Sequence, residues 1–150
     1  MINVLYIDDE LHNLTSFRAS FRRTFNVYTT ECVDEAKKIL DAKEIHVILS
    51  DQRMPKMTGI EFFESILKTH PDPIRILITG YTDINAVIDA INRGQVYKYL
   101  TKPWNENDIL NFIETAYEIY RLRKENETLT NKLIDANYKL EFLARQNLLS

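Results

Sequence analysis

Short apolar runs alternate with amphipathic segments over the first two thirds of the chain. Residues at intervals of three and four positions, such as Leu14, Phe17 and Phe21, predict helices between the runs. The apolar runs themselves have the length of buried strands, and they lie at 2–7, 27–30, 47–49, 74–79 and 96–100. Five alternations of strand and helix predict a parallel sheet that is covered by helices on both faces.

The last third of the chain contains neither proline nor glycine after Pro103, and it reads as one helix from about Asn105. A seam with the three-four spacing of a coiled coil runs along it, apolar except for its two asparagines, at Ile119, Leu122, Asn126, Leu129, Leu133, Ala136, Leu140, Leu143 and Asn147. Such a helix is about 65 Å long, so its distal half cannot pack on the sheet and needs a partner. We expect a parallel homodimer; an antiparallel pair, a bundle and a lone helix held by ion pairs are the alternatives.

The composition argues against nucleic-acid and membrane partners for this chain. The chain has 150 residues, 45% of them hydrophobic, and a formal net charge of −3, which does not favour nucleic-acid binding through this chain. Cys32 is the single cysteine, which fits a cytoplasmic protein. We find no signal peptide and no apolar run of membrane-spanning length, so we expect no membrane partner.

Reactive side chains follow four of the predicted strands. Asp8 and Asp9 follow the first, Asp51 the third, Thr79 ends the fourth, and Lys102 follows the fifth. The carboxyl ends of parallel strands meet at one edge of a sheet, which is where open α/β folds bind ligands. Clustered carboxylates repel one another unless cations offset them. Lys102 supplies one charge, and Mg²⁺ suits a site of few carboxylates plus water.

Such a site fits phosphoryl chemistry. A carboxylate can attack phosphorus to give an aspartyl phosphate. A metal ion and Lys102 would offset the charge on the phosphoryl oxygens, and the Thr79 hydroxyl would donate to one of them.

Together these motifs resemble the receiver domain of two-component response regulators, over residues 1 to about 118. The resemblance implies a flavodoxin-like, doubly wound sheet with strand order 2-1-3-4-5. It makes Asp51 the phosphoacceptor and Asp9 a direct Mg²⁺ ligand, with Asp8 acting directly or through water and the Arg53 carbonyl completing the protein ligands. The partner would be a sensor histidine kinase or a phosphotransfer protein.

Further roles are implied by the same resemblance. Lys102 would pair with the phosphoryl group, Thr79 and Tyr99 would form a coupled switch, and the bond before Pro103 would be cis. The segments 77–83 and 99–104 resemble receivers that precede HD-GYP phosphodiesterases or hydrogenase-type transcription activators. Bulky Arg53 and Tyr81 would shield the phosphoryl group, which leads to the hypothesis of a phosphorylated state longer-lived than seconds.

The predicted organisation is a receiver domain at 1–118 and a coiled-coil dimerisation or linker helix at 119–150. The seam is still running at Leu148, so we expect a fragment or a following output domain. We expect a phosphoacceptor, and no enzyme beyond slow self-dephosphorylation. One alternative is a haloacid-dehalogenase-like phosphatase, although Arg53 stands where that family has a second aspartate. The other is a coiled-coil scaffold that acts without phosphorylation.

Overall fold

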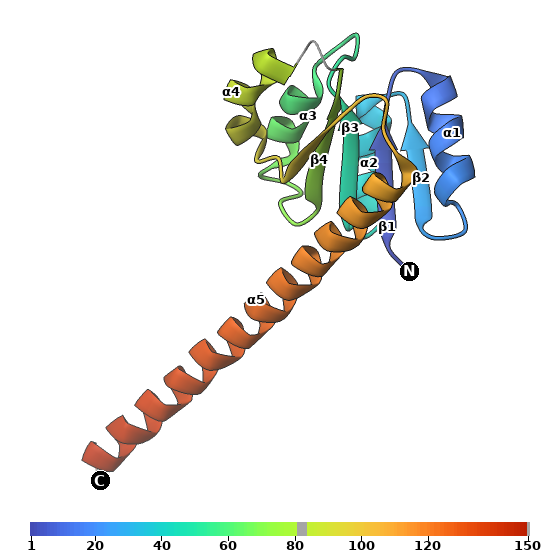
Figure 1. Cartoon of the computed structure of the whole chain (residues 1–150). Helices are drawn as coiled ribbons and strands as arrows, with labels where there is room; N and C mark the ends of the chain where they lie inside the picture. The colour runs from blue at the N-terminus through green and yellow to red at the C-terminus, as the bar shows by residue number, and fades with distance from the viewer. Residues whose placement is uncertain (81–83, 150) are drawn as a thin grey trace.

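A five-stranded parallel sheet forms the body of the protein, and one long helix projects from it (Figure 1). The computed structural model describes residues 1–80 and 84–149. The strand order is β2-β1-β3-β4-β5, which confirms the predicted flavodoxin-like arrangement. The elements are, in chain order, β1 (Asn3–Ile7), α1 (Leu11–Phe21), β2 (Asn26–Thr30), α2 (Val33–Ala42), β3 (Val47–Asp51), α3 (Gly59–Ile66), β4 (Ile74–Thr79), α4 (Ile84–Gly94), β5 (Lys98–Thr101) and α5 (Glu106–Leu149).

The central strands are mostly apolar because both of their faces are covered. In β1, Val4 and Tyr6 belong to a core shared with α1 and α5, whereas Leu5 and Ile7 belong to a second core shared with α2, α3 and α4. Successive side chains of a strand point to opposite faces, so one continuous apolar run supplies both cores. This burial fixes the strand register and therefore the positions of the strand ends.

The last strand begins two residues later than the sequence pattern predicts, at Lys98 instead of Val96. Gln95 has a positive φ of 49°, and the backbone N–H of Val96 donates to the carbonyl of Ile91. These residues therefore close the C-terminal end of α4 before the strand starts. The apolar character of Val96 reflects packing under that helix end and not sheet pairing.

Arg75, near the start of β4, is a buried arginine that ties three segments together. Its Nε donates to the carbonyls of Gly94 (3.1 Å) and Gln95 (3.2 Å) at the end of α4. Its Nη1 donates to the carbonyls of Pro71 (3.4 Å) and Pro73 (3.0 Å) in the α3–β4 loop. Carbonyls that the helix end leaves without partners thereby receive donors.

The α5 helix has two distinct parts. Its first turns pack on the sheet through Ile109, Ile113, Ala116 and Tyr120, and Tyr120 is the last of them, with 7% of its surface exposed. Beyond it the helix projects into solvent, as the orange-to-red segment of Figure 1 shows. Among the described residues, no helix is both long enough and apolar enough to cross a bilayer.

Two polar contacts hold α5 to the body of the protein at the point where the helix leaves it. The Tyr120 hydroxyl donates to Glu44 Oε1 at 3.1 Å, and Lys124 forms an ion pair with Asp72 in the α3–β4 loop. Contacts between α5 and the body of the protein therefore extend to Lys124.

Candidate functional site

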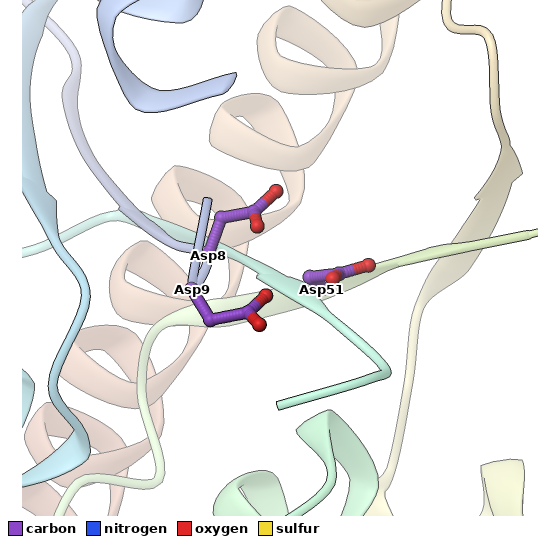
Figure 2. Close-up of side chains that lie close together, drawn as sticks. All are labelled: Asp8, Asp9 and Asp51. Atoms are coloured by element: carbon purple, nitrogen blue, oxygen red, sulfur yellow. The ribbon is translucent and has the colours of Figure 1, made fainter. Parts of the chain in front are cut away.

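Three carboxylates converge at the carboxyl edge of the sheet. Asp8 and Asp9 follow β1, and Asp51 is the last residue of the neighbouring strand β3 (Figure 2). One ligand oxygen from each residue lies within 4.8 Å of the others. Asp8 is fully buried and Asp51 is 5% exposed, whereas Asp9 is open to solvent. The pairing of β1 with β3 is what brings together acids that are more than forty positions apart.

Asp8 is held by three donors of the protein. The Tyr6 hydroxyl donates to its Oδ2 at 2.6 Å, and Asn13 Nδ2 donates to the same oxygen at 3.1 Å. The backbone N–H of Glu10 donates to Oδ1 at 3.0 Å. A buried carboxylate needs such partners, and these three orient it toward the site.

Lys102 brings a positive charge to the cluster from the end of β5. Its Nζ lies 3.0 Å from Asp51 Oδ1 and 3.9 Å from Asp8 Oδ2. The peptide bond between Lys102 and Pro103 is cis. One ammonium group thus faces two buried carboxylates, which leaves the cluster with an excess of negative charge.

Burial and the neighbouring charges shift the pKa values of these side chains. Burial, opposed by the hydrogen bond from Lys102, raises the pKa of Asp51 to about 6. Burial and the neighbouring charge of Asp8 raise the pKa of Asp9 as well. For Lys102, burial lowers the pKa, but its hydrogen bond and charge interaction with Asp51 outweigh burial and raise it overall. Burial and the hydrogen bond to Asp8 raise the pKa of Tyr6, so its hydroxyl stays a donor.

The residue set fits a small divalent cation with oxygen ligands. Three carboxylates offer oxygens within 4.8 Å of one another, and a cation among them would offset both their mutual repulsion and the burial that raises the pKa of Asp51. Mg²⁺ prefers one or two carboxylates together with carbonyl oxygens and water. Asp9 is the exposed member of the cluster, whereas Asp51 is buried at its strand end and Asp8 is already engaged by three donors.

The loop after β3 is anchored closely against the site. The backbone carbonyl of Gln52 accepts from the N–H of Gly59 at 3.1 Å, and its side-chain oxygen accepts from the N–H of Ile60 at 3.1 Å. Thr58 and Glu61 form a capping box at the start of α3. These bonds fix the segment that carries Arg53, which follows Asp51 by two residues.

Gly59 is required by the close approach of α3 to the acid strand. A Cβ at this position would lie 2.6 Å from the carbonyl oxygen of Asp51 and 2.8 Å from Leu77 Cδ1. No residue with a side chain fits there without displacing the backbone.

The two remaining predicted site residues lie at different depths. Thr79 is fully buried at the end of β4, where its hydroxyl donates to the carbonyl of Gly80 at 3.4 Å. Tyr99 on the neighbouring strand β5 is 41% exposed, so its ring points away from the core. Tyr81, which the sequence pattern assigns to shielding, lies outside the described residues.

The sequence did not identify Tyr6 or Asn13 as functional residues. Tyr6 lies within the apolar run 2–7, and Asn13 lies in the segment that the spacing of Leu14, Phe17 and Phe21 predicts as a helix. Residues two apart on a strand share a face, so a tyrosine two positions before a strand-end aspartate was the available signal.

Comparisons with known proteins agree with this geometry. Residues 4–114 match the model of the response regulator receiver domain. The chain is 35% identical over 125 residues to the hydrogenase transcriptional regulatory protein HoxA of Bradyrhizobium diazoefficiens; the match covers 83% of this chain but only 26% of that relative.

Solved structures show the same similarity. The signal receiver domain of an HD domain-containing protein from Pseudomonas fluorescens Pf-5 is 26% identical with a TM-score of 0.77, and the match covers 83% of this chain and 92% of that one. The beryllofluoride-activated NtrC4 receiver domain dimer is 31% identical with a TM-score of 0.72, and the match covers 80% and 99% of the two chains. With its sheet order, its acidic edge and a family match over most of its length, this chain belongs to the response regulator receiver domains of two-component systems.

Proposed function

We propose that Asp51 is the phosphoacceptor of this receiver and takes its phosphoryl group from the phosphohistidine of a sensor histidine kinase or a phosphotransfer protein. The observation that carries the proposal is the position of Asp51 at a strand end, 3.0 Å from Lys102 Nζ and among three carboxylates within 4.8 Å. Kinases of this class present their phosphohistidine in the cytoplasm, so the proposal places the chain there.

In the transfer, an ionised Asp51 oxygen attacks phosphorus, the phosphorus–nitrogen bond of the phosphohistidine breaks, and the imidazole leaves with its electron pair and takes up a proton. Mg²⁺ held by Asp9, Asp51 and the Arg53 carbonyl would offset charge on the phosphoryl oxygens. Lys102 supplies the second positive charge, which it already directs at Asp51. Asp8 completes the acidic set from its buried position.

The proposed response to phosphorylation runs through Thr79 and Tyr99. A phosphoryl group adds about −1.5 to −2 charges and three acceptor oxygens beside Asp51. The Thr79 hydroxyl, which now donates to Gly80 over a long 3.4 Å, gains a stronger acceptor by turning toward it. Space vacated by Thr79 lets the exposed ring of Tyr99 move inward. This change would reshape the surface formed by α4, β5 and α5.

We further propose that residues 119–150 are a dimerisation and linker helix that forms a parallel homodimer. Tyr120 faces the sheet, whereas Leu122 is 53% exposed; two residues of an α-helix are separated by about 200°. Beyond Ile119, which packs partly against the receiver core, the proposed seam therefore lies opposite the face that packs on the receiver. Its leucines are exposed along the whole projecting helix, so pairing does not compete with the receiver core.

Acetyl phosphate and Mg²⁺ test the acceptor directly. Intact mass spectrometry of wild type should show the addition of one phosphoryl group, and Asp51→Asn should show none. Incorporation into Asp51→Asn at the wild-type level would refute the assignment. If Asp51→Asn leaves dimerisation and output unchanged, the protein acts as a coiled-coil scaffold that does not depend on phosphorylation.

The dimer has its own matched pair of variants. Leu133→Asp places a charge in the proposed seam, whereas Ile134→Asp places it on an exposed neighbour outside the seam. Analytical ultracentrifugation should find the first monomeric and the second dimeric. In a Cys32→Ser background, Leu143→Cys should form a disulfide-linked dimer on mild oxidation only if the helices are parallel.

A further inference from the structure

The Tyr6 hydroxyl makes a short hydrogen bond to the acidic cluster. It lies 2.6 Å from Asp8 Oδ2, and both groups are fully buried. The Tyr6 ring is held in turn by Phe17 of α1, with ring centroids 4.7 Å apart in an edge-to-face arrangement. The donor is therefore rigid and aimed at one oxygen.

Asp8 Oδ2 is also the oxygen that Lys102 approaches. Lys102 Nζ lies 3.9 Å from it, beyond hydrogen-bond distance, and 3.0 Å from Asp51 Oδ1. An ionised carboxylate oxygen has two acceptor positions, and Tyr6 and Asn13 occupy both on Oδ2. With those positions filled, Lys102 is left to pair with Asp51.

From this arrangement we propose that Tyr6 is a positioning residue for the metal site: its hydroxyl holds Asp8 Oδ2 and so keeps Lys102 on Asp51 and Asp8 in the orientation that supports Mg²⁺ binding. The inference rests on the proposed function, because Mg²⁺ is the ion that the phosphotransfer site is taken to hold. Groups that orient metal-site carboxylates from behind change metal affinity by about 10- to 100-fold when they are lost.

Loss of the hydroxyl has a defined structural consequence. In Tyr6→Phe the ring still fills its place against Phe17, but Asp8 Oδ2 has a vacant acceptor position inside the protein. Lys102 Nζ lies 3.9 Å from that oxygen, and it moves from Asp51 toward Asp8 to satisfy it. The carboxylate set facing the ion is then misaligned, although the fold is kept.

The test is a Mg²⁺ titration of the full chain by isothermal calorimetry, with the fluorescence of Trp104, the single tryptophan, as a second signal. Tyr6→Phe should raise the Mg²⁺ dissociation constant about 10-fold. Tyr28→Phe, which removes a hydroxyl from the neighbouring strand β2, should stay within twofold of wild type. A Tyr6→Phe constant within twofold of wild type overturns the proposal.

A kinetic measurement separates positioning from general destabilisation. With acetyl phosphate as donor, Tyr6→Phe should need about 10-fold more Mg²⁺ for half-maximal phosphorylation. A reduced maximal rate with an unchanged Mg²⁺ requirement contradicts the positioning role.

Asn13→Ala provides the second variant if Tyr6→Phe does not fold, because Asn13 donates to the same oxygen from the edge of the site. It should weaken Mg²⁺ binding by at least threefold, and an unchanged constant overturns the proposal. Measurements on wild type separate failure of the proposed function from failure of the role of Tyr6. If wild type neither binds Mg²⁺ nor takes up a phosphoryl group, the proposed function fails; if it does both and the variants match it, only the role of Tyr6 fails.

Discussion

Lys102 Nζ lies 3.0 Å from Asp51 Oδ1, so the charge that would face a phosphoryl group is already paired with the proposed acceptor. The pair is buried incompletely on the lysine side and almost fully on the aspartate side. Lys102 thereby offsets part, but not all, of the cost of keeping an ionised carboxylate at this position.

Stability without Mg²⁺ should fall as Asp51 ionises. Its pKa in the folded protein is raised to about 6, above the ordinary value of 3.8. The protonated form is thus favoured by folding; its contribution is complete below about pH 4 and is lost as the pH rises through about 6. The full shift corresponds to about 3 kcal/mol at most. Urea unfolding between pH 4.5 and 7.5 should show wild type losing stability relative to Asp51→Asn over this window, and saturating Mg²⁺ should restore it. A difference between the two that is independent of pH would contradict the assignment.

Replacement of Gly59 by alanine should damage the site more than an ordinary glycine replacement does. The added Cβ would meet the Asp51 carbonyl oxygen at 2.6 Å, and neither that carbonyl nor Leu77 can withdraw freely. We expect a loss of about 1–3 kcal/mol in the free energy of unfolding and weaker Mg²⁺ binding. Gly94→Ala is the matched control, because its nearest neighbour is a side-chain atom, Phe63 Cβ at 3.3 Å. Equal losses in the two variants, measured by chemical denaturation, would show that the approach to Asp51 is not limiting.

Replacement of Arg75 by methionine should loosen the end of α4. The guanidinium donates to four carbonyls from two segments, and the substitution leaves those carbonyls without their donor. We expect a loss of about 2–4 kcal/mol in the free energy of unfolding. Hydrogen exchange should accelerate most at Gly94 and the residues that follow it. Arg75→Lys should rescue only part of the loss, since an ammonium group cannot span both pairs of carbonyls. Full rescue by lysine would show that charge alone matters.

The contacts that Tyr120 and Lys124 make where α5 leaves the receiver should affect the direction of the projecting helix. They should have little effect on the free energy of unfolding of the receiver. Tyr120 pairs with Glu44, and Lys124 pairs with Asp72, at the point where the helix leaves the receiver. Exposed ion pairs contribute about 0–1 kcal/mol, so Lys124→Met should barely change unfolding. Combined with Tyr120→Phe, it should broaden the spin-label distances between the receiver and the projecting helix. Lys139→Met, in an ion pair farther along the same helix, is the control and should leave those distances unchanged. An unaltered distance distribution in the double variant would show that these contacts do not set the direction of the projecting helix.

Much of the molecule was predictable because its signals are local. The apolar runs and the three-four spacing predicted the strands and helices of the described residues, and the strand-end acids predicted which carboxylates gather at the sheet edge. The start of β5 was placed two residues early, since apolar Val96 serves the helix end that precedes the strand. Tyr6 was missed as a site residue because a tyrosine in an apolar strand looks the same whether its hydroxyl meets solvent or a buried acid.

By itself the sequence determined the alternation of elements, the acidic and basic residues at the strand ends, and a helix too long for its own domain. Those are properties of neighbouring positions, and periodicity reports them. Only the tertiary structure decided that Tyr6 and Asn13 hold Asp8 Oδ2, that Lys102 sits on Asp51, and that Lys124 reaches Asp72. Such pairings depend on the register of parallel strands and on the angle at which helices cross them, and no local pattern encodes either.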